Sequence, residues 1–216
     1  MIIGLTEIND KMNTKKIILD LCGGTGSWSK PYLIAGYDVR VITLPDYNVL
    51  DYTPPENVYG ILAAPPCTEF SIAKGSRPRD LEYAMRVVEA CMRIIWKCRL
   101  QGGLKFWAME NPRGLLRQFL GVPSYTFEQW QFGEKKIKAT DIWGYFNRPK
   151  PIVKIKPAGL TVVWPNGRVN GRDWSKVECP AEYAAYISQF HGDDKRAALR
   201  AITPAGFALK FFQANL

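Results

Sequence analysis

Cys67 is the residue of this chain whose position most favours chemistry. It follows Pro65 and Pro66 at the end of an apolar run, residues 59–64, that predicts a buried strand. Proline fixes the backbone angle φ, so the cysteine is held on a stiff turn where the strand ends. Such a turn is a poor place for a packing residue and a good place to present a side chain for reaction. The sequence therefore makes Cys67 a candidate nucleophile.

A glycine-rich turn is the second chemical signal. It follows a predicted strand at residues 15–21 and reads Asp20-Leu21-Cys22-Gly23-Gly24-Thr25-Gly26. Glycines let the backbone approach a nucleotide-like ligand closely, although many such turns are only tight connections. The turn lacks the third glycine of a dinucleotide fingerprint and the Lys-Ser/Thr pair of a phosphate loop. These differences favour an adenosine-type ligand that lies across the strand ends.

Glu110 provides the third signal, because it stands with Asn111 and Pro112 at the end of a predicted strand, residues 104–109. In an α/β sheet, the carboxyl end of a strand faces the usual ligand crevice. A glutamate that only caps the loop explains this motif equally well when it is taken alone. Together, however, the three turns would converge on one edge of the sheet. That edge would combine a thiol, a carboxyl group and an adenosine pocket.

The elements that must position these turns alternate along the chain. Strands are predicted at residues 15–21, 39–44, 61–64 and 104–109, and helices at 28–35, 81–99, 181–190 and from 203 to 216. This order predicts an open, mostly parallel α/β sheet with helices on both faces. The helix at residues 81–99 has apolar residues at helical spacing, which places Cys91 and Cys98 in the core.

The composition of the chain limits the kinds of partner, compartment and metal site that it can have. The chain has 216 residues, 47% of them hydrophobic, and a formal net charge of +9. Residues 130–216 hold 14 Lys and Arg against 7 Asp and Glu, which suits a polyanionic partner, although solubility alone also explains a basic chain. No apolar run reaches the length of a membrane span. The five scattered cysteines and the single histidine predict no metal site and reduced thiols in a cytoplasmic compartment.

Taken in order, these motifs resemble the DNA cytosine-5 methyltransferase family. Residues 66–71 match the family's Pro-Cys-x-x-Phe-Ser motif, and residues 20–26 resemble its S-adenosylmethionine turn. Glu110 and Asn111 stand where the family has Glu-Asn-Val, and residues 203–212 match its final helix loosely. The resemblance covers residues 15–120 well. Short phage-encoded members with a reduced C-terminal part look especially similar.

The resemblance implies a Rossmann-like methyltransferase fold and the transfer of a methyl group from S-adenosyl-L-methionine to C5 of cytosine in DNA. Cys67 would add to C6 of a base flipped out of the double helix, and Glu110 would hold or protonate N3. Cys67 would then need a depressed pKa, which nearby cations could supply. The implied location is the cytoplasm of a bacterium or of a phage-infected host cell.

The resemblance also assigns residues to the cofactor. Asp20 and the turn would line its methionine and ribose side, Asn48 would face the adenine amino group, and Asp46 would bind the ribose hydroxyls. Cys22 stands where the family usually has Phe, which reduces one hydrophobic contact. The complete predicted cofactor set is Asp20, Cys22, Gly24, Thr25, Gly26, Asp46, Asn48 and Pro65.

The predicted DNA contacts depart most from the family. Its Gln-x-Arg-x-Arg strand is absent, and Lys136 with Lys138 is the candidate replacement, because alternate residues of a strand share a face. The large target-recognition region is also missing, and only the loop-rich residues 149–180 could replace it. The predicted DNA-binding residues are Ser71, Lys136, Lys138, Arg168 and Arg172.

The same reasoning divides the chain into three parts. Residues 1–148 would form the S-adenosylmethionine-binding catalytic domain, residues 149–180 a short basic insertion with reduced target recognition, and residues 181–216 helices that pack back on the catalytic domain. Two other functions are compatible with the sequence. One is a nucleic-acid-binding accessory module without catalysis, and the other is a cytosine-C5 modifier that acts on RNA or a nucleotide, or uses a variant cofactor.

Overall fold

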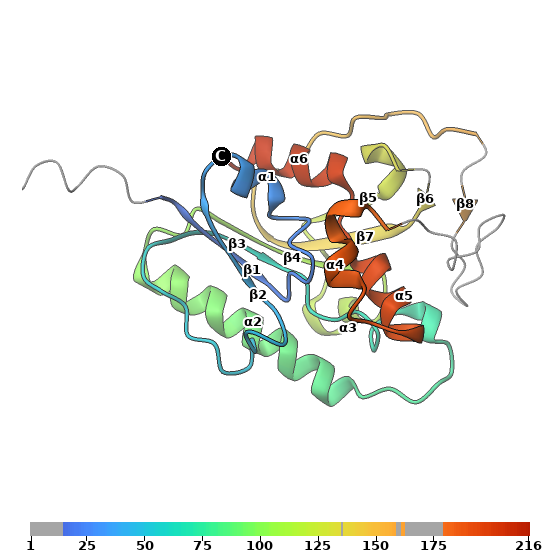
Figure 1. Cartoon of the computed structure of the whole chain (residues 1–216), viewed down its shortest axis with the longest axis horizontal. Helices are drawn as coiled ribbons and strands as arrows, with labels where there is room; N and C mark the ends of the chain where they lie inside the picture. Colours follow the sequence, from blue (N-terminus) through green and yellow to red (C-terminus); the bar gives the residue numbers. More distant parts are fainter. Residues whose placement is uncertain (1–14, 135, 159–160, 163–178) are drawn as a thin grey trace, which may run out of the picture.

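A six-stranded sheet forms the centre of the computed structural model, which describes residues 15–134, 136–158, 161–162 and 179–216. The strand order is β2-β1-β3-β4-β7-β5 (Figure 1). The bounds are β1 (Ile17–Leu21), β2 (Asp38–Ile42), β3 (Val58–Ala63), β4 (Phe106–Pro112), β5 (Tyr125–Glu128) and β7 (Ala139–Tyr145). Strands β2, β1, β3 and β4 pair in parallel, and β7 is antiparallel to both β4 and β5. The predicted α/β class with a mostly parallel sheet is therefore confirmed.

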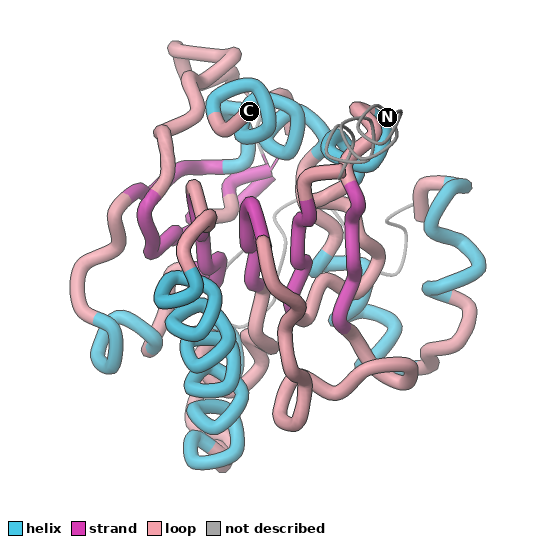
Figure 2. The backbone as a smooth tube through the Cα atoms, turned by 90° about the vertical axis from the view of Figure 1, so that its left-hand side faces the viewer, coloured by secondary structure: helices cyan, strands magenta, loops and turns pink. Residues whose placement is uncertain are grey.

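Both faces of the central strands are buried, which explains their nearly continuous apolar sequences. In β1, Leu19 and Leu21 pack on one side of the sheet, and Ile18 belongs to the core on the other side. Helix α2 (Leu81–Gln101) covers the first face, and α1 (Lys30–Ile34) with α6 (Ala205–Ala214) covers the second (Figures 1 and 2). The sheet is thus the middle layer of three.

Helix α2 is the element whose sequence signals are clearest. Asp80 caps its first turn by accepting a hydrogen bond from the Tyr83 N–H at 2.9 Å, and Gly102 ends it with a φ of +79°. Cys91 and Cys98 are 0% and 1% exposed within its apolar face. Their predicted place in the core is confirmed.

Helix α6 completes the second face with aromatic side chains. Phe207 and Phe211 are buried and contact Trp28, with ring centroids 6.0 and 5.3 Å from the indole. The Tyr32 hydroxyl donates to the backbone oxygen of Asn215 at 3.1 Å. The C-terminal residues therefore supply part of the main core.

Other elements differ from the sequence-based prediction. The predicted helix at residues 28–35 is shorter, because turns occupy residues 22–29. The predicted helix at residues 181–190 is divided into a 3-10 turn, η4 (Ala181–Tyr183), and α4 (Ala184–Ile187). The remaining elements were not predicted as such: η1 (Ile72–Lys74), α3 (Leu116–Leu120), η2 (Gln129–Phe132), α5 (Gly192–Ala201) and the β5 and β7 strands, together with the parallel pair β6 (Lys136–Ile137) and β8 (Thr161–Val162).

Strand β7 escapes prediction because a charged residue lies in its middle. Asp141 is fully buried, and its carboxylate is held by Arg117 on α3 and by the Thr126 hydroxyl, the latter at 2.8 Å. A buried ion pair hides the apolar pattern that marks a strand. In the part of the chain that the structure describes, no helix is long and apolar enough to cross a membrane.

Removing buried volume from the sheet tests this packing. Leu62 in β3 is 0% exposed, so Leu62→Ala should lower the free energy of unfolding by about 2–5 kcal/mol. Leu100, at the end of α2, is 86% exposed, so Leu100→Ala should change it by less than about 0.5 kcal/mol. Urea unfolding followed by circular dichroism measures both, and equal losses would contradict the packing.

Candidate active site

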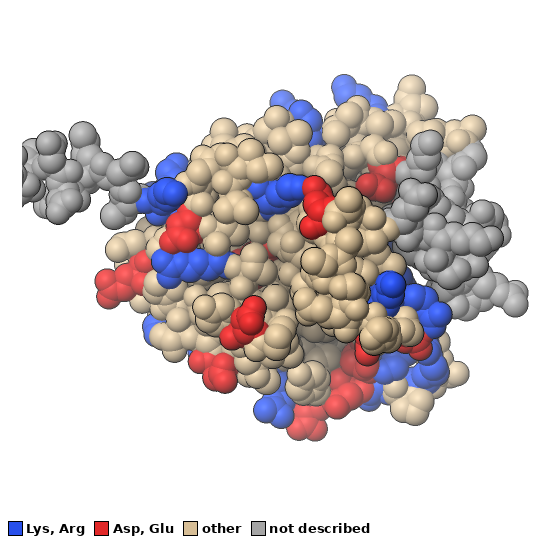
Figure 3. All heavy atoms as spheres, in the orientation of Figure 1, with Lys and Arg blue, Asp and Glu red and all other residues tan. Residues whose placement is uncertain are grey.

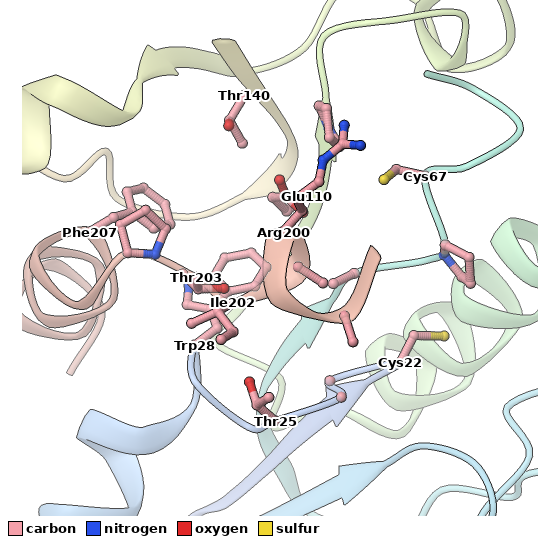
Figure 4. Close-up of a pocket in the computed structure, with 18 of the residues that line it drawn as sticks. Cys22, Thr25, Trp28, Cys67, Glu110, Thr140, Arg200, Ile202, Thr203 and Phe207 are labelled. Atoms are coloured by element: carbon pink, nitrogen blue, oxygen red, sulfur yellow. The ribbon is translucent and has the colours of Figure 1, made fainter. Parts of the chain in front are cut away.

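A pocket opens at the carboxyl ends of β1, β3 and β4. Strand β1 has β2 on one side and β3 on the other, so the strand order reverses there, which is where open α/β sheets usually bind ligands. Figure 4 shows the glycine turn with Thr25 and Trp28 at one end of the pocket and Cys67 with Glu110 at the other. The empty space within the lining, including its mouth, is about 950 Å³.

The Cys67 turn is fixed by its own backbone and by β4. The carbonyl of Cys67 accepts hydrogen bonds from the N–H groups of Phe70, at 3.1 Å, and Ser71, at 2.8 Å. The Asn111 side-chain amide donates to the Pro65 carbonyl at 2.9 Å, and Asn111 is fully buried. The Glu-Asn-Pro segment therefore holds the Pro-Pro-Cys segment in place, and both Cys67 and Glu110 line the pocket.

Glu110 lies in a setting that favours its neutral form. Burial raises the pKa of its carboxyl group, the nearby carboxylate of Asp141 raises it further, and the ammonium of Lys138 opposes both effects. Arg117 compensates the Asp141 charge, since its guanidinium pairs with that carboxylate. The Glu110 carboxyl group therefore keeps its proton to a higher pH than an exposed glutamate does.

The thiol of Cys67 does not have the depressed pKa expected from the sequence. Burial is the largest effect and raises its pKa, and Glu110 also raises it. Lys138 and Arg200 act in the opposite direction without reversing the result. The expectation was wrong because it counted cations and not desolvation, which disfavours any charged thiolate.

Two cations reach the pocket from different parts of the chain. Lys138, which was predicted, lies just before β7 and donates from its ammonium to the backbone carbonyl of Arg200 at 2.9 Å. Arg200, which was not predicted, comes from α5. Lys136, the other predicted lysine, lies on β6. None of the residues of α5 is buried, and this segment was not predicted as a helix, so no sequence signal pointed to Arg200.

Asp20, at the end of β1 just before the glycine turn, lines the pocket with a buried side chain. Asp20 is 0% exposed, and one of its carboxylate oxygens accepts a hydrogen bond from the Ser29 hydroxyl at 2.6 Å. Its other oxygen, Oδ1, has no hydrogen-bond partner among the described residues. Burial raises the pKa of Asp20 to about 6. A Cβ at Gly23 would lie 2.4 Å from the Asp20 Cγ, so only glycine leaves room for this carboxylate.

The structure brings most of the predicted cofactor residues together. Asp20, Cys22, Gly24, Thr25 and Pro65 all line the pocket. Gly26 belongs to the same turn, donating its N–H to the Gly23 carbonyl at 2.9 Å.

Two predicted cofactor residues lie elsewhere. Asp46 and Asn48 are exposed in the connection after β2, and neither lines the pocket. The side-chain oxygen of Asn48 accepts a hydrogen bond from the Leu50 N–H at 3.1 Å, so it serves the local turn.

The predicted DNA contacts are only partly placed. Lys138 lines the pocket, whereas Ser71 lies in the turn that supports Cys67 and forms a bridge with Gly114. Arg168 and Arg172 lie outside the described residues, as does the hairpin expected near residues 164–168.

Residues 186–207 of the C-terminal segment form one side of the pocket. Ala198 and Ala201 on α5 line it, together with Thr203, whose N–H donates to the Ser27 hydroxyl oxygen at 2.8 Å. Tyr186 on α4 also lines it and lies over Gly24. The sequence signals for this part of the pocket were the predicted helices within residues 181–216 and the loose family match at residues 203–212.

Comparison with known proteins adds no family to this geometry. No protein-family model matches the chain, and no curated protein matches it. Within residues 15–134, 136–158, 161–162 and 179–216, no group of three or more His, Cys, Asp or Glu residues could hold a metal ion. Any function must therefore be argued from the pocket itself.

The buried carboxylate makes stability depend on pH. The pKa of Asp20 is about 6 in the folded chain, against an ordinary value of 3.8, so the folded state binds this proton more tightly than the unfolded chain does. Stability is therefore lost as the pH rises from about 4 to about 6. Asp20→Asn, whose oxygen still accepts from Ser29, removes this loss. The variant should be more stable than the parent chain by up to about 3 kcal/mol at pH 7.5 and nearly equal to it at pH 4.

Urea unfolding of both chains at the two pH values measures this difference. A stability difference that is the same at pH 4 and pH 7.5 would contradict the buried carboxylate.

Proposed function

We propose that this protein methylates C5 of cytosine in DNA, with Cys67 as the covalent nucleophile. One observation carries the proposal: Cys67 and Glu110 follow neighbouring parallel strands, paired at Ala63 and Met109, and line one pocket with the glycine turn after β1. A thiol, a carboxyl group with a raised pKa and a glycine turn in one cavity form a specific combination. The motif resemblance to cytosine-5 methyltransferases adds the substrate.

The pocket residues provide the chemistry that this substrate requires. C5 of cytosine is a weak nucleophile, and addition of the Cys67 thiolate to C6 makes C5 enamine-like. As the C6–S bond forms, the C5–C6 π electrons move through the ring, and the Glu110 carboxyl group gives its proton to N3. After C5 has been alkylated, the C5 proton is lost to solvent, its electron pair re-forms the C5–C6 double bond and expels the Cys67 sulfur, and N3 returns its proton to the Glu110 carboxylate. The thiolate is thereby regenerated.

The electrostatics support these two roles. Glu110 must be protonated before attack, and burial together with Asp141 raises its pKa in that direction. Cys67 must be ionised at the moment of attack, and Lys138 and Arg200 favour that form against the effect of burial. Neutralising Glu110 also removes the charge that opposes the thiolate. Protonated Glu110 can therefore both donate to N3 of the cytosine and leave the Cys67 thiolate without a neighbouring negative charge.

The residues around the glycine turn suit S-adenosylmethionine. Asp20 presents a buried oxygen that has no hydrogen-bond partner among the described residues and could accept from a cationic or N–H group of the ligand. Gly24 has a φ of +54°, a backbone conformation that favours glycine, and Trp28 and Phe207 provide apolar surface. When bound, this cofactor supplies the electrophilic methyl group. Asp20 and the turn would hold it beside the Cys67 end of the pocket.

DNA is the proposed substrate because the chain is basic and the pocket is recessed. A base must leave the stack to reach a thiol within such a cavity. The net charge is +9, but on the face in Figure 3 cations and acids are interspersed. The charge therefore supports a polyanionic partner in general, and the assay must separate DNA from RNA.

The first test is methyl transfer to cytosine. Labelled S-adenosylmethionine and double-stranded DNA should give 5-methylcytosine with the parent chain and none with Cys67→Ser, because a hydroxyl group is a far weaker nucleophile at C6. Cys179→Ser, which changes a half-buried thiol outside the pocket lining, should retain activity. Both variants should keep the thermal shift that the cofactor produces, which shows that they are folded.

DNA that contains 5-fluorocytosine sharpens this test, because fluorine cannot leave C5 as a cation and the thiol stays attached. Peptide mass spectrometry should locate the adduct at Cys67. An adduct at Cys22, or none with active protein, would contradict the mechanism. Transfer to RNA and not to DNA would move the proposal to the alternative substrate, and salt-sensitive DNA binding without transfer would favour an accessory module.

The second test concerns the proton that Glu110 donates. Glu110→Gln keeps the size of the side chain but has no acidic proton, so the single-turnover methylation rate should fall by about 10² or more. DNA affinity should change little, since the amide can still hydrogen-bond to the base. Rapid-quench measurement of methyl transfer gives the rate. A rate within about tenfold of the parent would remove Glu110 from the chemistry.

A further inference from the structure

We propose that Arg200 is a positioning residue that stabilises the thiolate of Cys67 from the C-terminal helix α5. The inference deepens the proposed function, on which it rests for the use made of the thiolate. Arg200 lines the same pocket as Cys67 and Glu110, although more than a hundred residues separate it from the thiol in sequence. Figure 4 shows its side chain reaching from α5 toward Cys67 and Glu110.

The backbone around Arg200 is fixed at two points. Its carbonyl oxygen accepts a hydrogen bond from the Lys138 ammonium at 2.9 Å. Three residues later, the Thr203 N–H donates to the hydroxyl oxygen of Ser27, in the glycine turn, at 2.8 Å. Ala198 and Ala201 face the pocket with small side chains, which allows α5 to approach closely. These contacts involve the backbone, so they survive substitution of the arginine side chain.

The charges around Cys67 leave few groups that favour its ionised form. Burial and Glu110 raise its pKa, whereas Lys138 and Arg200 lower it. Asp20 lines the same pocket from the β1 side. The Lys138 ammonium also bonds to the last turn of α5, where helix carbonyls carry partial negative charge. A guanidinium remains charged at every pH that the protein experiences, so Arg200 provides a constant field at the thiol.

The pH profile of Cys67 alkylation tests this role without DNA or cofactor. Iodoacetamide modification of the Cys67 peptide, quantified by mass spectrometry, follows the thiolate fraction. In Arg200→Gln the rate at pH 7.5 should fall by about three- to tenfold, and the inflection should move to higher pH. Arg200→Lys should restore most of the rate. Arg196→Gln, which removes an exposed cation paired with Asp193 on the same helix, should match the parent.

Two controls keep the result interpretable. Thermal unfolding reports whether each variant is folded, and Arg200→Met, which retains the aliphatic stem, replaces Arg200→Gln if the latter unfolds. An alkylation profile that is the same in Arg200→Gln or Arg200→Met as in the parent would overturn the proposal. An unchanged profile with weaker, less salt-dependent DNA binding would instead identify Arg200 as a phosphate contact, and would also overturn it.

The alkylation test of Arg200 and the methyl-transfer test of the proposed function can succeed or fail independently. A shifted alkylation profile in a protein that transfers no methyl group would support Arg200 and contradict the methyltransferase. An unshifted profile in an active methyltransferase would do the reverse.

Discussion

Apolar side chains on both faces of β1, β3 and β4 are buried by α2 on one side and by α1 and α6 on the other. This burial is the interaction on which the site depends. Crossover connections such as α2, between β3 and β4, make neighbouring strands run in parallel and end at one edge, where their turns lie outside the sheet. Cys67, Glu110 and the glycine turn are neighbours for that reason. The bond from Asn111 to the Pro65 carbonyl then fixes two of these turns to each other.

The same burial sets the electrostatics of the pocket. It raises the pKa values of Asp20, Cys67 and Glu110, three acids of different strength that line one pocket. For Glu110 the shift is useful to a proton donor, and for Cys67 it is an obstacle that cations must offset. A single environment thus assists one half of the proposed reaction and resists the other. Lys138 and Arg200 partly offset this resistance, because both cations lower the pKa of the Cys67 thiol.

Local signals made part of this arrangement predictable. The helix at 81–99, the strands before the three turns and the convergence of Cys67 with Glu110 all follow from periodicity and from the geometry of parallel sheets. What remained hidden depends on distant contacts. Strand β7 carries a buried aspartate whose partner lies on α3, and α5 has no buried residue that would mark it as part of the core. Local sequence also could not show that Asn48 would serve its own turn.

The position of α6 has a consequence for the order in which the molecule is made. Translation delivers β1, β3 and β4 with their thiol and carboxyl group well before Phe207 and Phe211, which fill the second face of the sheet. Until those aromatic rings arrive, the nascent chain exposes Ile18, Leu62 and Phe106 to water. The thiol of Cys67 is therefore synthesised well before Phe207 and Phe211 can complete the core on the second face of the sheet.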